Sequence, residues 1–240
     1  MRLFQNVMIV LEIFKRIFIF ASIVFLLPVF FLLTIISFLD TKKFPILIQE
    51  RGLTLNKFRF KLFKFRTIRD FPSERIQNSN SILKKRDLLN YVSPIGRFLR
   101  KTGLDELPQL INILLGQMNF FGPRALSIED LQEIKSKFPD FYIRREKINS
   151  KPGLLGLWQV NKDFQCSVEN LIRLDEEFDK FKSLKMNYRI LLKAIEIILF
   201  GYHIDSIVNG DRLKVYPVVI YATIFSSLVL ISFFILNLVF

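Results

Sequence analysis

Hydrophobic and polar positions divide the chain into three parts. Residues 17–39 and residues 217–240 carry no charged side chain, whereas residues 40–216 carry nearly all of the charge. At ~1.5 Å per residue, each uncharged stretch is long enough for a hydrocarbon core ~30 Å thick. The pattern therefore predicts a membrane-inserted segment over residues 1–39, a water-facing domain over residues 40–216 and a C-terminal transmembrane helix over residues 217–240.

The first uncharged stretch has two features that are unusual for a simple span. Pro28 lies at its middle, where it removes a backbone donor and predicts a kink. Lys15 and Arg16 precede the stretch, and Lys42 and Lys43 follow it, so positive charge favours keeping both ends in the cytoplasm. We therefore expect a re-entrant helix that turns back at Pro28. A transmembrane helix with a proline kink is the alternative.

The last uncharged stretch has the pattern of an ordinary span. Arg212 and Lys214 stand just before it, and it contains no proline beyond its first residue, Pro217. Basic residues collect on the cytoplasmic side of a span, so the C-terminus is expected outside. A hydrophobic hairpin or a dimerisation tail is the alternative.

The middle part has mixed periodicity, which predicts an α+β, mainly helical domain with a small β element. Residues 58–66 alternate like a strand, but the phase shifts at Leu62 and Phe63. A bulge or a change of buried face would explain the shift. Clusters of Pro, Ser, Asn and Gly predict a loop over residues 71–80 and a turn over residues 151–156.

Three further stretches have helical spacing. Residues 107–115 are apolar at helical intervals and stop at Gly116, a typical C-terminal cap. Residues 169–181 and 186–199 follow the same periodicity. The last of these has a wide apolar face with Arg189 and Lys193 opposite, which is typical of an interfacial membrane helix.

Composition narrows the chemistry. The chain has 35 basic and 22 acidic residues, a formal net charge of +13, one Cys and one His. A single Cys excludes an intrachain disulfide, and one Cys with one His cannot build a zinc cluster by themselves. His203 is the only base for a His-dependent triad, and no nucleophile signature lies near it. Any catalysis is therefore expected to use carboxylates, Lys, Arg and a hard metal ion.

The segment from Gly96 to Leu110 holds the densest candidate chemistry, because cations precede the adjacent carboxylates Asp105 and Glu106. Proline is tolerated in the first turn of a helix, so Pro108 predicts that Asp105 is the N-cap of the helix that follows. Free amides and the helix dipole favour anions there. A purely structural role, with Asp105 as a cap and Glu106 complementing the dipole, is the alternative.

These residues belong to a series of blocks that resembles the bacterial sugar transferase family, the monotopic polyprenyl-phosphate phosphoglycosyl transferases. The resemblance covers roughly residues 14–200. After the N-terminal Lys-Arg and hydrophobic segment, the blocks occur in the family's order: Gln49-Glu50-Arg51-Gly52, Lys64-Phe65-Arg66-Thr67, Gly96 to Thr102, Leu104 to Leu110, Gly122-Pro123-Arg124, Pro152 to Asn161, and Leu174-Asp175.

The resemblance implies transfer of a sugar-1-phosphate from a UDP-sugar to a polyprenyl phosphate such as undecaprenyl phosphate, at the cytoplasmic face of the bacterial inner membrane. It implies that Asp105 attacks the sugar-linked phosphorus, that UMP leaves, and that Glu106 holds Mg²⁺. The product would start a lipid-linked glycan. The residues expected to bind the substrate are Lys64, Arg66, Arg97, Arg100, Pro123, Arg124, Lys162 and Asp175.

Elementary electrostatics agrees with this chemistry. A carboxylate that attacks a phosphoanhydride meets like-charge repulsion, which cations, a hard metal and free backbone amides reduce. Aspartate is a known nucleophile in aspartyl-phosphate chemistry, so a usable His is not required. For Arg97 and the other cations, a solvated or lipid-facing position is the alternative. Asp175 is expected to assist the metal, with a surface position on a charged helix as its alternative.

Several positions depart from the family pattern. Ala125 stands where members usually have a second proline, so the loop expected to hold the nucleotide is predicted to be less rigid. Lys162 and Asp163 replace a Gly-Arg pair, and Lys162 substitutes only partly for the expected phosphate-binding Arg. Leu27 and Gly103 each replace a serine. These departures leave room for altered substrate choice or weak activity.

Two other functions compete with this interpretation. One is a catalytically silent membrane scaffold of the same fold that docks downstream glycosyltransferases. The loss of the expected Arg after Asn161 favours this hypothesis. A membrane-tethered nucleic-acid binder is suggested by the basic, Phe-rich residues 57–66. Interleaved acidic residues argue against nucleic acid, and membrane lipids explain the Phe-rich faces more simply. No nucleic-acid partner is expected.

Overall fold

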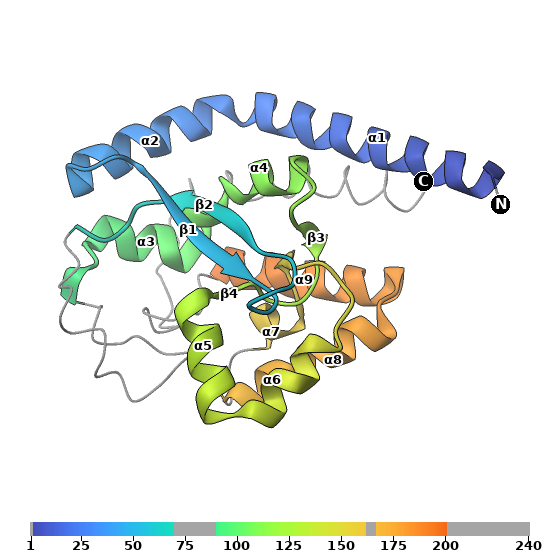
Figure 1. Ribbon diagram of the computed structural model, residues 1–240. Helices are drawn as coiled ribbons and strands as arrows, with labels where there is room; N and C mark the ends of the chain where they lie inside the picture. Colours follow the sequence, from blue (N-terminus) through green and yellow to red (C-terminus); the bar gives the residue numbers. More distant parts are fainter. Residues whose placement is uncertain (1, 70–89, 162–166, 201–240) are drawn as a thin grey trace.

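The protein is described by a computed structural model over residues 2–69, 90–161 and 167–200. Within these residues helices predominate over two small sheets, as the α+β prediction expected (Figure 1). The predicted loop at 71–80, the predicted span at 217–240 and Lys162 lie outside the described residues. The predicted domain boundaries stay predictions.

Two apolar helices, α1 (Arg2–Phe25) and α2 (Leu27–Thr41), form an arch along one side of the molecule (Figure 1). The predicted kink is confirmed: the helices meet at Leu26, Pro28 lies in the first turn of α2, and the axes bend by 58°. Proline is accepted there because the first-turn amides have no partner inside the helix. Within the described residues no single helix meets the length and hydropathy required of a membrane span, whereas the bent pair does when taken together.

The arch has an inner and an outer face. Ile19 of α1 and Leu33 of α2 are buried against the rest of the molecule. Asp40 fixes the far end, because its carboxylate accepts hydrogen bonds from the Ser93 hydroxyl and from Arg69. The outer face leaves large apolar side chains in contact with solvent: Ile13, Phe14, Ile17, Phe20, Phe25, Phe31, Leu32, Phe38 and Leu39. A soluble protein rarely exposes an apolar surface of this extent.

A β-hairpin lies beneath the arch. Strand β1 (Ile46–Gly52) pairs with β2 (Phe60–Phe65) in an uninterrupted antiparallel register, and β4 (Leu126–Ser127) pairs with the end of β1. The predicted phase shift is therefore a change of buried face, without a bulge. Phe60 and Leu62 pack on one core cluster, whereas Phe65 points to the other face and packs against Leu33.

Helix α3 (Pro94–Thr102), the 3-10 turn η3 (Leu104–Glu106) and α4 (Gln109–Leu114) follow one another. The Ser93 hydroxyl caps α3 by accepting the amide of Gly96, at 2.8 Å. Gly103 ends α3 with a φ of 71°, and Gly116 follows α4 with a φ of 72°. These left-handed conformations are the ones that glycine adopts without strain. The predicted end of the helix at Gly116 is confirmed.

Residues 151–156, predicted as a turn, contain a short strand. Residues Gly153–Leu155 form strand β5, which pairs in parallel with β3 (Asn119–Phe121). The backbones cross so closely that a Cβ on Gly153 would lie 2.0 Å from the amide nitrogen of Gly122. The glycines in this region permit that approach, which sequence periodicity within one short segment does not reveal.

The far end of the molecule is helical. Helices α5 (Ile128–Lys137), α6 (Pro139–Glu146), α7 (Leu157–Val160) and α8 (Val168–Phe181) surround a core cluster that contains Trp158. Helix α9 (Leu184–Phe200) closes the fold, so both helices predicted from residues 169–199 are confirmed. Ile190, Leu191 and Ala194 face the core, while Leu184, Tyr188 and Leu192 form an exposed stripe along α9.

Candidate functional site

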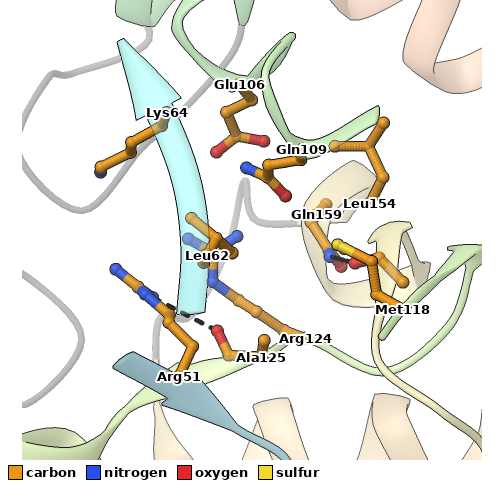
Figure 2. Close-up of a pocket in the computed structure, with 11 residues that line it drawn as sticks. Arg51, Leu62, Lys64, Glu106, Gln109, Met118, Arg124, Ala125, Leu154 and Gln159 are labelled. Atoms are coloured by element: carbon orange, nitrogen blue, oxygen red, sulfur yellow. Dashed lines mark hydrogen bonds between the residues drawn. The ribbon is translucent and has the colours of Figure 1, made fainter. Parts of the chain in front are cut away.

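A polar pocket opens between the hairpin, η3–α4, and the loop that precedes β4 (Figure 2). It brings together residues from five separate stretches of the chain, and its described lining contains three cations and a single carboxylate. The lining residues are Arg51, Leu62, Lys64, Glu106, Gln109, Met118, Arg124, Ala125, Gly153, Leu154 and Gln159. A pocket with this charge balance is suited to an anionic group.

The two predicted catalytic carboxylates occupy different environments. Glu106 lines the pocket, whereas Asp105 is buried at 3% exposure and is not among the lining residues. Both lie in the 3-10 turn η3, which packs against β2 and α3. The prediction that Asp105 caps the next helix is wrong: Gly103 precedes η3, no side chain caps η3 or α4, and α4 begins only after Pro108. The 3-10 turn accommodates Pro108 without an α-helical cap.

Two of the predicted phosphate-binding cations reach this pocket. Lys64 comes from β2 and Arg124 from the loop between β3 and β4. A third cation, Arg51 at the end of β1, was not singled out as a site residue. Its guanidinium donates to the carbonyl of Ala125 at 3.2 Å (Figure 2). It also donates to the side-chain oxygen of Gln49. The hairpin register explains the convergence, because it aligns β1 and β2 side by side along one wall.

Arg124 is held from beneath by a buried ion pair. Arg145 of α6 is fully buried, and its guanidinium donates to Asp175 at 2.5 Å, to the carbonyl of Leu53 at 2.6 Å and to the carbonyl of Arg124. Asp175 also accepts the amide of Arg124, at 3.2 Å. Burial raises the pKa of the Asp175 carboxyl, against the opposing effect of Arg145. Asp175 thus positions the loop from below and does not line the pocket.

Hydrogen bonds also hold this loop at the residues on either side of Arg124. Gly153 donates its amide to the carbonyl of Pro123 at 2.9 Å, and Arg51 holds the carbonyl of Ala125. Pro123 is buried outside the pocket lining. Hydrogen bonds from Arg51, Arg145 and Gly153 therefore constrain the backbone where a second proline is missing at Ala125.

The remaining predicted cations lie away from the pocket. Arg66 donates to the carbonyl of Phe44 at 2.9 Å, and exposed Arg97 donates to the carbonyl of Val92 at 3.3 Å. Arg100 is buried at 3% exposure and donates to the Thr67 hydroxyl at 2.8 Å. The structure does not bring these three side chains into the pocket lining, and Lys162 lies outside the described residues.

Two glutamines in the pocket were also missed by the sequence reasoning. Gln109 opens α4, and Gln159 lies in α7. The Gln159 side-chain oxygen is buried and accepts no hydrogen bond within the described structure. An unsatisfied buried oxygen favours a ligand that brings a donor or a cation. Gln109 belongs to the Leu104 to Leu110 block and Gln159 to the Pro152 to Asn161 block of the family resemblance. Membership of these blocks is the only sequence signal that could have identified them.

The few oxygen donors of the pocket match what a protein usually contributes to a weakly held Mg²⁺ ion. Among the described residues no group of three Asp, Glu, His or Cys side chains is placed to hold a metal. Mg²⁺ is usually held by one or two carboxylates together with water and substrate phosphates. The Glu106 carboxylate and the unsatisfied Gln159 oxygen are hard donors of this type, and substrate phosphates would complete the set.

Comparison with known proteins places the chain in a family. The chain matches the bacterial sugar transferase family over residues 7–201. It is 33% identical over 159 residues to the exopolysaccharide production protein ExoY of Rhizobium meliloti, covering 62% of this chain and 68% of that protein. It is 32% identical over 170 residues to the UDP-glucose:undecaprenyl-phosphate glucose-1-phosphate transferase of Klebsiella pneumoniae, covering 69% of this chain and 34% of that protein.

A further relative is the undecaprenyl-phosphate galactose phosphotransferase of Salmonella typhimurium, 35% identical over 108 residues, covering 45% of this chain and 21% of that protein. The chain therefore matches between 21% and 35% of the length of the longer relatives. The family match extends over all the described elements that line the pocket, from β1 to α7. This chain belongs to the bacterial sugar transferase family, whose members are phosphoglycosyl transferases.

Proposed function

We propose that this protein transfers a sugar-1-phosphate from a UDP-sugar to undecaprenyl phosphate or a similar polyprenyl phosphate, and so starts a lipid-linked glycan. The observation that carries the proposal is that Arg51, Lys64, Arg124 and Glu106 line one pocket, and that Asp105 immediately precedes Glu106 in the chain. Cations in such a pocket offset the charge of a diphosphate and of the transition state. The names of the relatives supply the two substrates.

The proposed reaction has two displacements at the sugar-linked phosphorus. A carboxylate oxygen of Asp105 attacks it, the bond to the UMP oxygen breaks, and UMP leaves with the electron pair. An oxygen of the lipid phosphate then attacks the same phosphorus and releases Asp105. Mg²⁺, when bound, would withdraw charge from the phosphate oxygens, and Glu106 is the residue proposed to hold it.

The position of Asp105 sets a condition on this mechanism. Its side chain is buried and is not among the described lining residues, so nucleophilic attack requires η3 to expose it to the bound diphosphate. The 3-10 turn is only three residues long and has no side-chain cap. Short 3-10 segments have weak hydrogen-bond geometry and are common places for such rearrangement. Substrate binding at Arg124 and Lys64 would stabilise the reactive arrangement.

The location proposed for the reaction is the cytoplasmic face of the bacterial cytoplasmic membrane. The apolar outer faces of α1, α2 and α9 would lie in lipid, which would place the pocket near the polyprenyl phosphate headgroup. Downstream glycosyltransferases would then take up the lipid-linked product. The bent helix pair supports this arrangement, since its exposed apolar surface needs a partner.

The test uses the full chain purified in detergent with Mg²⁺, undecaprenyl phosphate and a panel of UDP-sugars, and it measures UMP release. Asp105→Asn is expected to abolish release, because an amide is not a nucleophile toward phosphorus. Glu106→Gln is expected to slow release and to raise the Mg²⁺ concentration required. Glu176→Gln is the matched control, since Glu176 pairs with Arg144 on the surface away from the pocket.

A second measurement identifies the nucleophile. Without the lipid acceptor, the wild type is expected to release one UMP per protein and to gain the mass of a phosphosugar on Asp105. If Asp105→Asn still forms the adduct and Glu106→Gln does not, the nucleophile assignment is wrong. If no UDP-sugar is turned over although the purified protein is folded, the transferase proposal fails and the scaffold hypothesis is favoured.

A further inference from the structure

A second and larger cavity lies along β3, between α1, the 149–151 segment and the beginning of α9. Its volume is about 890 Å³, and it shares no lining residue with the pocket around Glu106. Four cations line it: Lys15 and Arg16 from α1, Lys151 from the segment before β5, and Lys182 from the α8–α9 connection. None of these four is placed in the proposed transfer reaction.

The acidic residues near the cavity do not balance this charge. Glu12 is the one acid among the described lining residues, 3.6 Å from Lys15 and 3.9 Å from Arg16. Asp179 lies 3.9 Å from Lys182, outside the lining. Burial opposes ionisation of Asp179, but hydrogen bonds from Ser150 and from the amides of Asn149 and Ser150 outweigh it and lower its pKa. The cavity therefore keeps an excess of positive charge and favours an anion.

Polar groups in the same cavity indicate a ligand with hydroxyl groups. The side-chain oxygen of Asn187 in α9 is buried and accepts no hydrogen bond within the described structure. A buried acceptor without a donor costs free energy, so a ligand hydroxyl would relieve that cost. Asn119 offers a second polar contact, since its side-chain oxygen accepts from Lys15 at 3.3 Å.

The cavity also has an apolar side that continues onto the surface proposed to face lipid. Phe120 and Leu191 are buried in its wall, and Leu184 at its rim is half exposed. On α1, the exposed apolar residues Ile13 and Ile17 adjoin the cavity-lining residues Glu12 and Arg16 in sequence. A ligand that fits both halves carries an anionic, hydroxyl-bearing head and an apolar tail.

We propose that this cavity binds the phosphate headgroup of an anionic glycerophospholipid. Lys15, Arg16, Lys151 and Lys182 would surround the phosphodiester, and Asn187 would accept a hydrogen bond from a glycerol hydroxyl. The acyl chains would leave along α1 toward its exposed apolar face. The proposal does not depend on the transfer reaction, because the two cavities have separate walls.

The test titrates the full chain in a neutral detergent with dihexanoyl phosphatidylglycerol and measures binding by calorimetry. Dihexanoyl phosphatidylcholine, which has the same tails and a zwitterionic head, is expected to bind roughly tenfold more weakly or worse, because it lacks net charge and a hydroxyl. Inorganic phosphate and glycerol 3-phosphate form a second arm. If either binds as tightly as the lipid, the site serves a soluble phosphate and the lipid assignment is overturned.

Two pairs of variants locate the binding. Lys151→Gln with Lys182→Gln is expected to weaken phosphatidylglycerol roughly tenfold, because two charge-assisted contacts are lost. Lys137→Gln with Lys147→Gln removes the same charge from exposed positions outside the cavity and is expected to bind like the wild type. Equal weakening in both pairs would show general attraction to a basic protein and would overturn the proposal.

A single substitution tests the same site independently of whether the double variant folds. Asn187→Asp keeps the side-chain shape but adds a negative charge beside the cations, so phosphatidylglycerol affinity is expected to fall. Thermal unfolding followed by fluorescence of the buried Trp158 checks that the variant is folded. Unchanged affinity in folded Asn187→Asp would contradict placement of the headgroup in this cavity. Asp105→Asn is expected to bind the lipid like the wild type, which separates this test from that of the transfer reaction.

Discussion

Arg145 shows how much a single side chain contributes to the pocket without lining it. Among the described residues it is the largest that is fully buried, and its guanidinium joins Leu53, directly after β1, to the Arg124 loop and to Asp175 on α8. A buried guanidinium is stable only when its charge and its donors are satisfied. The arrangement fixes the backbone of Arg124 at both its amide and its carbonyl. Asp175, predicted to assist a metal, is the anion that makes this possible.

Asp175→Asn is expected to destabilise the fold by on the order of 3–5 kcal/mol, because it leaves the buried Arg145 charge without its counter-ion. Chemical denaturation followed by the fluorescence of Trp158, the only tryptophan, measures the free energy of unfolding. Where the variant still folds at low temperature, we expect weaker binding of the UDP-sugar through the displaced Arg124 loop.

The neighbouring residue supplies the control for this substitution. Glu176 pairs with Arg144 at 2.5 Å, but both side chains are more than a third exposed. Solvent screening makes such a pair worth less than about 1 kcal/mol, so Glu176→Gln is expected to unfold nearly like the wild type. Equal losses of stability in the two variants would contradict the importance assigned to the buried pair.

Among the elements, the pairing of β3 with β5 decides where the Arg124 loop lies. Both strands have only three residues, and neither has a periodicity that a sequence pattern can detect. Their parallel pairing depends on the close approach of Gly122 and Gly153, which are 31 positions apart. The predicted turn at 151–156 was therefore a partial description, because a strand of this length exists only where its partner is present. The helices at 169–181 and 186–199 were predictable, since their periodicity is local.

Gly153→Ala is expected to abolish or strongly reduce folding, because its Cβ would lie 2.0 Å from the Gly122 nitrogen and 2.5 Å from the Gly122 Cα. Gly103→Ala is the comparison. No atom lies within 4 Å of the Cβ added there, but a φ of 71° disfavours alanine by about 1–2 kcal/mol. Melting temperature followed by Trp158 fluorescence ranks the two variants. A larger loss for Gly103→Ala would show that the strands separate more easily than this contact implies.

At the scale of the whole molecule, the bent helix pair is both the element proposed to enter the membrane and part of the core. Ile19 packs with Phe60 and Leu110, and Leu33 packs with Phe65 and Leu99. The opposite face of the pair is apolar and exposed. The rest of the domain therefore holds α1 and α2 along one side, and that arrangement favours insertion from one face of the bilayer.

Cysteine labelling tests whether the pair re-enters. In a Cys166→Ser background, Arg2→Cys and Lys43→Cys are both expected to react with a membrane-impermeant maleimide in inverted inner-membrane vesicles and not in intact spheroplasts. The physical reason is that Lys15, Arg16, Lys42 and Lys43 flank the apolar stretch on both sides, and carrying either end across the bilayer is unfavourable. Lys137→Cys, exposed on α5, marks the side of the polar domain. Labelling of the two ends from opposite sides would show that the pair spans the membrane.

The sequence by itself determined the apolar segment and its kink, the longer helices, the hairpin strand β2 and the block of residues that includes Asp105 and Glu106. These properties are local: hydrophobic periodicity, the missing amide of Pro28 and the order of short motifs along the chain. Only the tertiary structure decided which side chains meet. It placed Glu106 in the pocket lining and buried Asp105 outside that lining, brought in Arg51, Gln109 and Gln159, and left Arg66, Arg97 and Arg100 elsewhere. Such convergence depends on strand register, glycine contacts and a buried ion pair between distant segments, which no local pattern specifies.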